Sequence, residues 1–287
     1  METVHRQSAL RSYFLAALLA VCCGGCCILG RGLGPVPPPL PRSEILAALS
    51  QRAEQFQTVY DTGITLTVEL ETDKGMETQP RLGGILAFNR RLPGLWMRAE
   101  KMTVRVFELH ALGERFSLEL PDKREFVTGG REAYEKLPYL IHPYEAIAWF
   151  GAPGWLGLNG DSTMQLEEND YRFDVFLDGL LIRSVFVDRR TVAISRIVDY
   201  DLIGNVHTAV LMDRYRKVGN MEFPHQLTVD RPLYGCRVTL KLSSPKFNNP
   251  KVDNRKIFEP RKPPPGWDVI DLDYEPLSNV KTFSGEQ

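Results

Sequence analysis

Four of the five cysteines lie close together near the N-terminus, as Cys22, Cys23, Cys26 and Cys27. Thiols at this spacing could hold a metal ion or carry a covalently attached lipid. Zinc binding is disfavoured, because no histidine lies beside them and the two pairs are too close in the chain to enclose one ion without other structure. Lipid attachment fits better, because the cysteines follow a short apolar stretch that begins at Tyr13.

The first 25 residues have the pattern of an export signal, with Arg6 and Arg11 ahead of the apolar stretch. We expect cleavage before Cys26, because two small glycines precede it and let a peptidase reach the backbone. Lipid attachment is therefore predicted at Cys26. Cys22 is a weaker alternative, because the residue before it is bulky. An uncleaved anchor also stays open, since the uncharged run 13–29 is only slightly short of the ~20 residues that cross a bilayer.

This N-terminus predicts a lipid-anchored protein of the cell envelope that faces the periplasm. The residue after Cys26 is Cys27 and not an acidic residue of the kind that acts as a retention signal, which favours the outer over the inner membrane. Residues 26–42 are rich in proline and glycine and predict an extended tether between membrane and domain.

Motifs of catalysis are scarce in the rest of the chain. It has no Gly-x-Ser-x-Gly, no phosphate-binding glycine loop and no His-Glu-x-x-His. Beyond the signal the histidines are dispersed, as His110, His142, His207 and His225, of which the last two could be neighbours on adjacent strands. The acidic pairs have no identifiable partner base. The sequence thus predicts neither an enzyme nor a cofactor or metal site.

Charge and the fifth cysteine narrow the classes further. A net charge of −1 lacks the basic footprint of a nucleic-acid-binding protein. Cys236 opens a predicted strand and is expected to be a small buried apolar group. A disulfide between Cys236 and Cys27 stays conceivable outside the cytoplasm.

The elements that position these residues begin with a helix over residues 44–58, in which apolar side chains recur at helical spacing after Ser43 as the N-cap. From residue 62 the apolar period changes to two, as in Ile64, Leu66 and Val68, which is typical of a half-buried strand. Further strands are predicted over 83–89, 95–101, 103–110, 114–120, 163–168, 171–178, 180–188, 191–202, 206–215, 221–229 and 236–242. Short connections between them indicate antiparallel hairpins.

One insert, residues 131–150, interrupts the strands and predicts two short helices separated at Pro138 and Pro143. The expected fold class is mainly β (α+β). It is one large curved antiparallel sheet or unclosed β-barrel, with an N-terminal helix and the short helical insert acting as plug or lid. We expect one domain over 43–270. The proline-rich end should run along its edge, with 271–287 as a C-terminal tail.

This order of elements resembles the LolA/LolB-type lipoprotein-sorting proteins over residues 43–270. Local stretches are similar too: Gly84–Phe88, Leu95–Ala99, Phe107–Leu109, Phe116–Pro121 and Phe223-Pro224 followed by a strand. The resemblance implies an apolar cavity that receives acyl chains, with helices as a lid. In the outer-membrane receptor of that family an apolar side chain on a protruding loop assists transfer. Leu156 and Leu158 are the nearest counterparts here by composition.

The expected function is that of an exported, membrane-tethered lipoprotein that binds a lipid or acyl group in an apolar cavity, with a role in lipoprotein or lipid transport. The candidate ligand-binding residues are Ile64, Leu66 and Val68 from the first strand and Tyr139, Trp149 and Trp155 from the aromatic-rich insert and the loop after it. The alternative is a non-enzymatic envelope sensor or protein-interaction scaffold, with a protein partner bound at an exposed apolar patch on the insert.

Overall fold

The computed structural model describes residues 35–143, 145–146, 153–219 and 221–274. The chain divides into two units, residues 1–37 and residues 38–287, and every described helix and strand belongs to the second. The predicted export signal, Cys26 and Cys27 lie outside the described residues. Among the described residues, no helix combines the length and the apolar character needed to cross a membrane.

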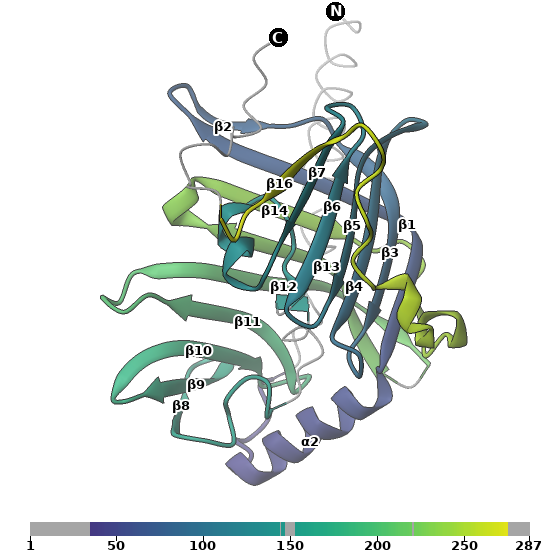
Figure 1. Cartoon of the computed structure of the whole chain (residues 1–287). Helices are drawn as coiled ribbons and strands as arrows, with labels where there is room; N and C mark the ends of the chain where they lie inside the picture. The colour runs from purple at the N-terminus through teal and green to yellow at the C-terminus, as the bar shows by residue number, and fades with distance from the viewer. Residues whose placement is uncertain (1–34, 144, 147–152, 220, 275–287) are drawn as a thin grey trace, which may run out of the picture. The chain divides into compact units, whose positions relative to one another are not determined.

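One sheet of sixteen strands dominates the second unit (Figure 1). Its elements are α2 (Arg42–Gln55), β1 (Thr58–Thr72), β2 (Gly75–Thr78), β3 (Leu82–Asn89), β4 (Gly94–Lys101), β5 (Val104–Leu112), β6 (Arg115–Leu120), β7 (Glu125–Gly129), β8 (Ser162–Leu166), β9 (Asp170–Leu177), β10 (Leu180–Asp188), β11 (Ala193–Tyr200), β12 (Val206–Val218), β13 (Met221–Arg231), β14 (Cys236–Lys241), β15 (Lys246–Phe247) and β16 (Asp268–Asp271). Short 3₁₀ helices occupy Glu132–Lys136, Pro232–Tyr234, Pro250–Asp253 and Arg255–Ile257.

The strand order is β16-β7-β6-β5-β4-β3-β1-β14-β13-β12-β11-β10-β9-β8, and β2 and β15 pair with β1 beside this path. Only β16 and β7 pair in parallel; the other described pairs are antiparallel. The two ends of the order, β16 and β8, do not pair with each other in the described part of the chain, so the sheet is unclosed. The prediction of one large antiparallel sheet with an N-terminal helix is confirmed.

Alternation along the strands decides which side chains enter the core. In β1, Ile64 and Leu66 are buried while Thr65 and Thr67 are partly exposed. A bulge between Asp61 and Ile64 interrupts this alternation near the start of the strand. The predicted strand therefore began at residue 62, although β1 begins at Thr58.

Asp61 ties this bulge to the segment after β14. Its buried carboxylate accepts backbone N–H groups from Gly63 at 2.8 Å, Ser243 at 2.8 Å and Ser244 at 3.1 Å. A buried carboxylate with three such donors is satisfied without a cation. Asp61 thus joins the middle of the sheet to the beginning of the C-terminal segment.

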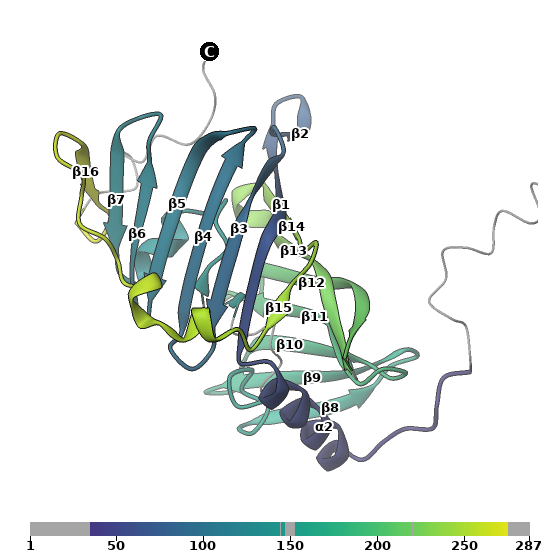
Figure 2. The same cartoon turned by 90° about the vertical axis from the view of Figure 1, so that its right-hand side faces the viewer.

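The sheet bends so that β3–β7 run at a steep angle to β8–β12, with α2 at one end of the bend (Figures 1 and 2). The concave side holds the main core, to which α2 contributes Ile45 and Leu49 and the insert contributes Leu137 and Ile141. Arg42 at the start of α2 donates hydrogen bonds to the carbonyl oxygens of residues 158 and 162 at 2.9 and 2.7 Å. The helix therefore packs against part of the concave side and is held there by these hydrogen bonds.

The predicted helix boundaries were wrong by two or three residues. Helix α2 begins at Arg42, so Pro41 and not Ser43 occupies the N-cap position, and it ends at Gln55. Proline fits there because its fixed φ and missing N–H cost little at a helix start. The helix ends early because residues 56–58 turn the chain into β1.

Four short strands were not predicted from the sequence: β2, β7, β15 and β16. All four residues of β2 are exposed, so no apolar alternation marks it. Strands β15 and β16 lie in the proline-rich end, which we expected only to follow the domain edge. After β15 pairs with β1, residues 250–258 cross the face of the sheet opposite the main core, and β16 then pairs with β7.

The described part of the insert contains two short helical segments, as expected, separated by residues 137–142, which include Pro138. The first is the 3₁₀ helix Glu132–Lys136, and residues 143, 145 and 146 belong to the second. Pro143 therefore begins a helical turn and does not break one, which agrees with the tolerance of proline in a first helical turn. Residues 144 and 147–150 lie outside the described residues.

Candidate functional site

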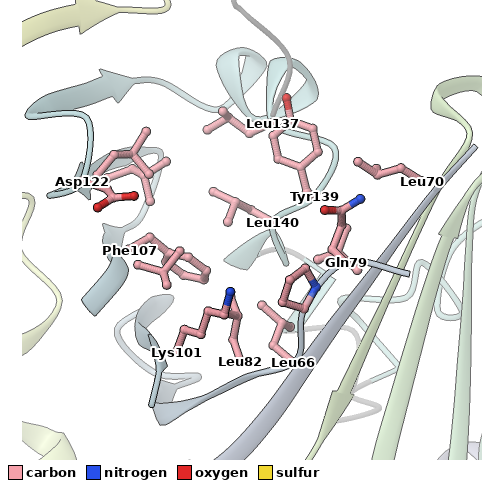
Figure 3. Close-up of a pocket in the computed structure, with 15 residues that line it drawn as sticks. Leu66, Leu70, Gln79, Leu82, Lys101, Phe107, Asp122, Leu137, Tyr139 and Leu140 are labelled. Atoms are coloured by element: carbon pink, nitrogen blue, oxygen red, sulfur yellow. The ribbon is translucent and has the colours of Figure 1, made fainter. Parts of the chain in front are cut away.

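An apolar cavity of about 280 Å³ lies between the concave face of the sheet and the insert (Figure 3). Its walls come from β1, β3, β5 and β6, and the insert covers part of it. The lining residues are Leu66, Val68, Leu70, Gln79, Pro80, Leu82, Lys101, Val106, Phe107, Leu118, Leu120, Asp122, Leu137, Tyr139 and Leu140. Only three of these, Gln79, Lys101 and Asp122, carry an amide or a formal charge.

The cavity exists because the concave side is filled unevenly along β1. Near Val59, a void of only about 20 Å³ remains, and Phe88 and Phe223 are among its lining residues. Farther along β1, Val68 and Leu70 are only partly buried although they point to the same face as Leu66. The elements that fill the concave side thus do not reach this end of β1, and the alternating apolar side chains of β1 form an apolar surface there.

A buried arginine holds the insert over the cavity. Arg231, at the end of β13, is only 1% exposed and donates hydrogen bonds to the carbonyl oxygens of Pro138 and of Leu140, the latter at 3.0 Å. It also lies 2.7 Å from each carboxylate oxygen of Glu145. Since Leu140 lines the cavity, this cluster couples the position of the cover to β13.

The same cluster sets the protonation of its members. Burial, reinforced by the charge of Arg231, lowers the pKa of His142 to about 4 against the opposing attraction of Glu145. Burial alone would raise the pKa of Glu145, but His142 and Arg231 together hold it below the usual value. His142 is therefore neutral and Glu145 charged at neutral pH.

The predicted ligand-binding residues divide into those at the cavity and those elsewhere. Leu66, Val68 and Tyr139 line it. Ile64 is buried in the core and is not among the lining residues, and Trp155 is 52% exposed on the loop before β8. Trp149, like the predicted lipidation site Cys26, lies outside the described residues.

The expected protruding side chains, Leu156 and Leu158, are fully buried. The expectation from composition was wrong, because the loop folds inward onto the core. Large apolar side chains that are strongly exposed lie in hairpin turns instead, among them Met102 at 94%, Ile203 at 84% and Leu202 at 78%.

The described residues of the insert form no exposed apolar patch of the kind that a protein-interaction scaffold would need there. Its described apolar side chains are buried or partly buried, including Tyr134 at the 3₁₀ turn and Ile141. The scaffold alternative therefore loses its expected docking place within the described part of residues 131–150.

His207 and His225 are not neighbours. The pairs Asp213↔Gln226 and Tyr215↔Pro224 place His225 at the far end of the β12–β13 hairpin from His207. Within the described residues no group of three or more His, Cys, Asp or Glu could hold a metal ion. Cys236 is buried as a free thiol, and burial raises its pKa to about 11.

The opposite face of the sheet carries a polar cluster that the sequence analysis missed. Glu108 accepts hydrogen bonds from Trp96 Nε1 at 3.0 Å and Arg105 at 2.6 Å, and its Oε1 lies 3.1 Å from His110 Nε2. Burial alone would raise the pKa of Glu108, but these contacts lower it to about 2. His110 Nδ1 lies 2.8 Å from the carbonyl oxygen of Ile257, so the cluster fastens the C-terminal segment. The only feature of the sequence that could have indicated this cluster is the alternation in β5, which places Glu108 and His110 on the same face of the strand.

Comparison with known proteins gives a likeness at the level of structure. No model of a known protein family matches the sequence, and neither does any curated protein. A solved DUF1329 family protein from Desulfovibrio piger matches over 72% of this chain and 92% of its own, with 12% identity and a TM-score of 0.51. The two proteins share a fold. The prediction of an unclosed, curved antiparallel sheet is thereby confirmed.

Two further solved structures carry the names that the sequence resemblance anticipated. A putative outer membrane lipoprotein-sorting protein domain from Vibrio parahaemolyticus matches 75% of this chain and 97% of its own, with 13% identity and a TM-score of 0.48. A LolA superfamily protein from Nitrosomonas europaea matches the same shares, with 11% identity and a TM-score of 0.45. The suspected relatives are thus among the structural neighbours of this chain.

Proposed function

We propose that this protein is a non-enzymatic carrier that binds one acyl chain of a lipid in the cavity between β1, β5, β6 and the insert. The observation that carries the proposal is an apolar cavity of about 280 Å³ walled by leucine, valine and phenylalanine side chains. Pockets that bind small ligands have this character, with a few polar groups at defined places. The proposal keeps Leu66, Val68 and Tyr139 as ligand contacts.

The size of the cavity sets how much of a chain it can take. A dry cavity of about 150 Å³ admits benzene, so about 280 Å³ has room for on the order of ten to twelve carbons. Each buried methylene contributes about 0.8 kcal/mol, a gross gain of about 8 kcal/mol for ten. Costs of ordering and association lower this gain, so a Kd between roughly 1 μM and 1 mM is expected.

We place the carrier in the cell envelope, tethered through a lipid on Cys26 and facing the periplasm, with the outer membrane favoured. The N-terminal sequence pattern supports this placement, and the proline-rich residues that follow would give the domain reach from the membrane. Intact mass of the purified protein with palmitate labelling tests the tether. An unmodified, uncleaved N-terminus would refute it.

A series of primary alcohols from octanol to hexadecanol tests the binding proposal without any charge. Affinity should rise about fourfold per methylene while the cavity fills, since 0.8 kcal/mol per CH₂ corresponds to that factor. Beyond on the order of twelve carbons the rise should flatten, because further methylenes stay in water. Native mass spectrometry of the protein as purified should show a bound acyl compound.

A cavity-filling variant locates the site. Leu118→Trp places a larger side chain in the cavity and should weaken dodecanol binding at least tenfold, whereas Leu211→Trp, on an exposed position of β12, should not. Leu140→Trp fills the cavity from the insert if Leu118→Trp perturbs folding, and urea unfolding reports on that. Unchanged binding in both folded cavity variants would overturn the proposal.

A further inference from the structure

The rim of the cavity carries one cation and one anion, contributed by different turns. Lys101 ends β4, and Asp122 lies in the turn between β6 and β7. In Figure 3 the amino group of Lys101 points inward among the lining side chains, and Asp122 lies at the side of the lining set. A ligand with an acyl chain in the cavity would therefore have its first polar atoms near these groups.

Lys101 is free to meet a ligand. Its neighbour Glu100 is paired with Arg98 at 2.9 Å and does not compensate it. Within the described residues, no ion pair or hydrogen bond engages the Lys101 side chain. A lysine in this position can lay its methylene stem along an apolar wall, here Leu82 and Val106, and keep its ammonium group at the opening.

An uncompensated ammonium at an apolar opening favours one class of amphiphile. Apolar walls lower the local dielectric and strengthen its attraction for an anion placed beside the acyl chain. The apolar walls do not strengthen the attraction of the ammonium group for an uncharged hydroxyl head group to a comparable degree. Asp122 opposes anions on its own side of the rim, which orients the head group toward Lys101.

We propose that the cavity selects single-chain amphiphiles that carry an anionic group, a carboxylate or a phosphate monoester, within the first atoms of the chain, and that Lys101 is the specificity-determining residue. This inference rests on the proposed acyl-chain binding. It adds the head group of the ligand and the residue that recognises it.

The test compares four ligands with one chain length: dodecanoate, dodecyl phosphate, dodecanol and dodecyltrimethylammonium. Equilibrium dialysis of the full-length protein at low salt should show dodecanoate binding about fivefold more tightly than dodecanol, a factor typical of one partly exposed charge pair. The cation should bind more weakly than dodecanol. Whichever of dodecanoate and dodecyl phosphate binds better identifies the anion.

Variants assign the selectivity to Lys101. Lys101→Met keeps the apolar stem and should remove the preference for anions, so that dodecanoate binds no more tightly than dodecanol in this variant. Lys101→Glu should invert the order of anion and cation, and Asp122→Asn should raise dodecanoate affinity about twofold. Lys74→Met, at an exposed residue between β1 and β2 outside the cavity lining, is the matched control and should change nothing.

The outcomes separate this inference from the proposed function. Absence of binding by all four ligands would overturn both. Equal affinities for dodecanol and dodecanoate, or a preference that survives Lys101→Met, would overturn the head-group inference alone and leave an acyl carrier without charge selectivity.

Discussion

Replacing Arg231 by methionine should loosen the insert and destabilise the protein strongly. The guanidinium is almost completely buried and contacts both oxygens of Glu145 and two backbone carbonyls. Methionine fills much of the volume but leaves the Glu145 carboxylate buried without its cation. Removing one partner of a buried ion pair in this way costs about 3–5 kcal/mol.

Urea unfolding followed by tryptophan fluorescence measures this loss. With a slope of about 3 kcal/mol per molar urea, the midpoint should fall by roughly 1 to 1.7 M. Hydrogen exchange should accelerate in residues 132–142 before it does in β9, because the lost contacts hold the insert. Arg237→Met is the control, since Arg237 is exposed and its pairing with Asp230 at 2.8 Å should be worth at most about 1 kcal/mol.

A second variant separates the charge from the packing. Arg231→Met combined with Glu145→Gln removes both charges and should recover a good part of the stability lost in the single variant. A loss for Arg231→Met no larger than that for Arg237→Met would refute the assignment of Arg231 as the anchor of the insert. Failure of the double variant to recover any stability would instead assign the cost to the lost carbonyl contacts.

Three further outcomes are expected from the structure. Lowering the pH from 6.5 to 4 should reduce the free energy of unfolding by on the order of 3 kcal/mol more in the wild type than in His142→Phe. The pKa of His142 in the folded state, about 4, lies below its ordinary value, so only the unfolded state takes up the proton in this range. Urea titrations at each pH measure the difference, and parallel pH profiles would contradict it. Asp61→Ala should lower the free energy of unfolding by about 3 kcal/mol and Asp61→Asn by less, since alanine leaves several buried N–H donors without an acceptor. Equal losses in the two variants, measured by urea unfolding, would argue against the hydrogen bonds as the cause. Gly84→Ala should separate β3 from β4, because an added Cβ would lie 2.0 Å from the carbonyl oxygen of Arg98, and a thermal midpoint unchanged from wild type would show that the strands approach less closely.

Most of the sheet could be predicted from the sequence, because alternation is a local property. The side of each strand that faces the core follows from every second residue, as in Ile64 and Leu66, and short turns force antiparallel neighbours. Short strands without alternation could not be found in this way. Strand β16, for example, exists only because β7 offers it an edge.

The sequence by itself determined a curved, unclosed antiparallel sheet and an apolar face on β1. Tertiary structure alone decided where that face is covered and where it stays open, because this depends on how far α2 and the insert extend over it. It brought Leu66, Val68 and Tyr139 to the cavity and left Ile64 in the filled core. It also joined Arg231 to Glu145 across 86 residues of chain, a contact that no local pattern encodes.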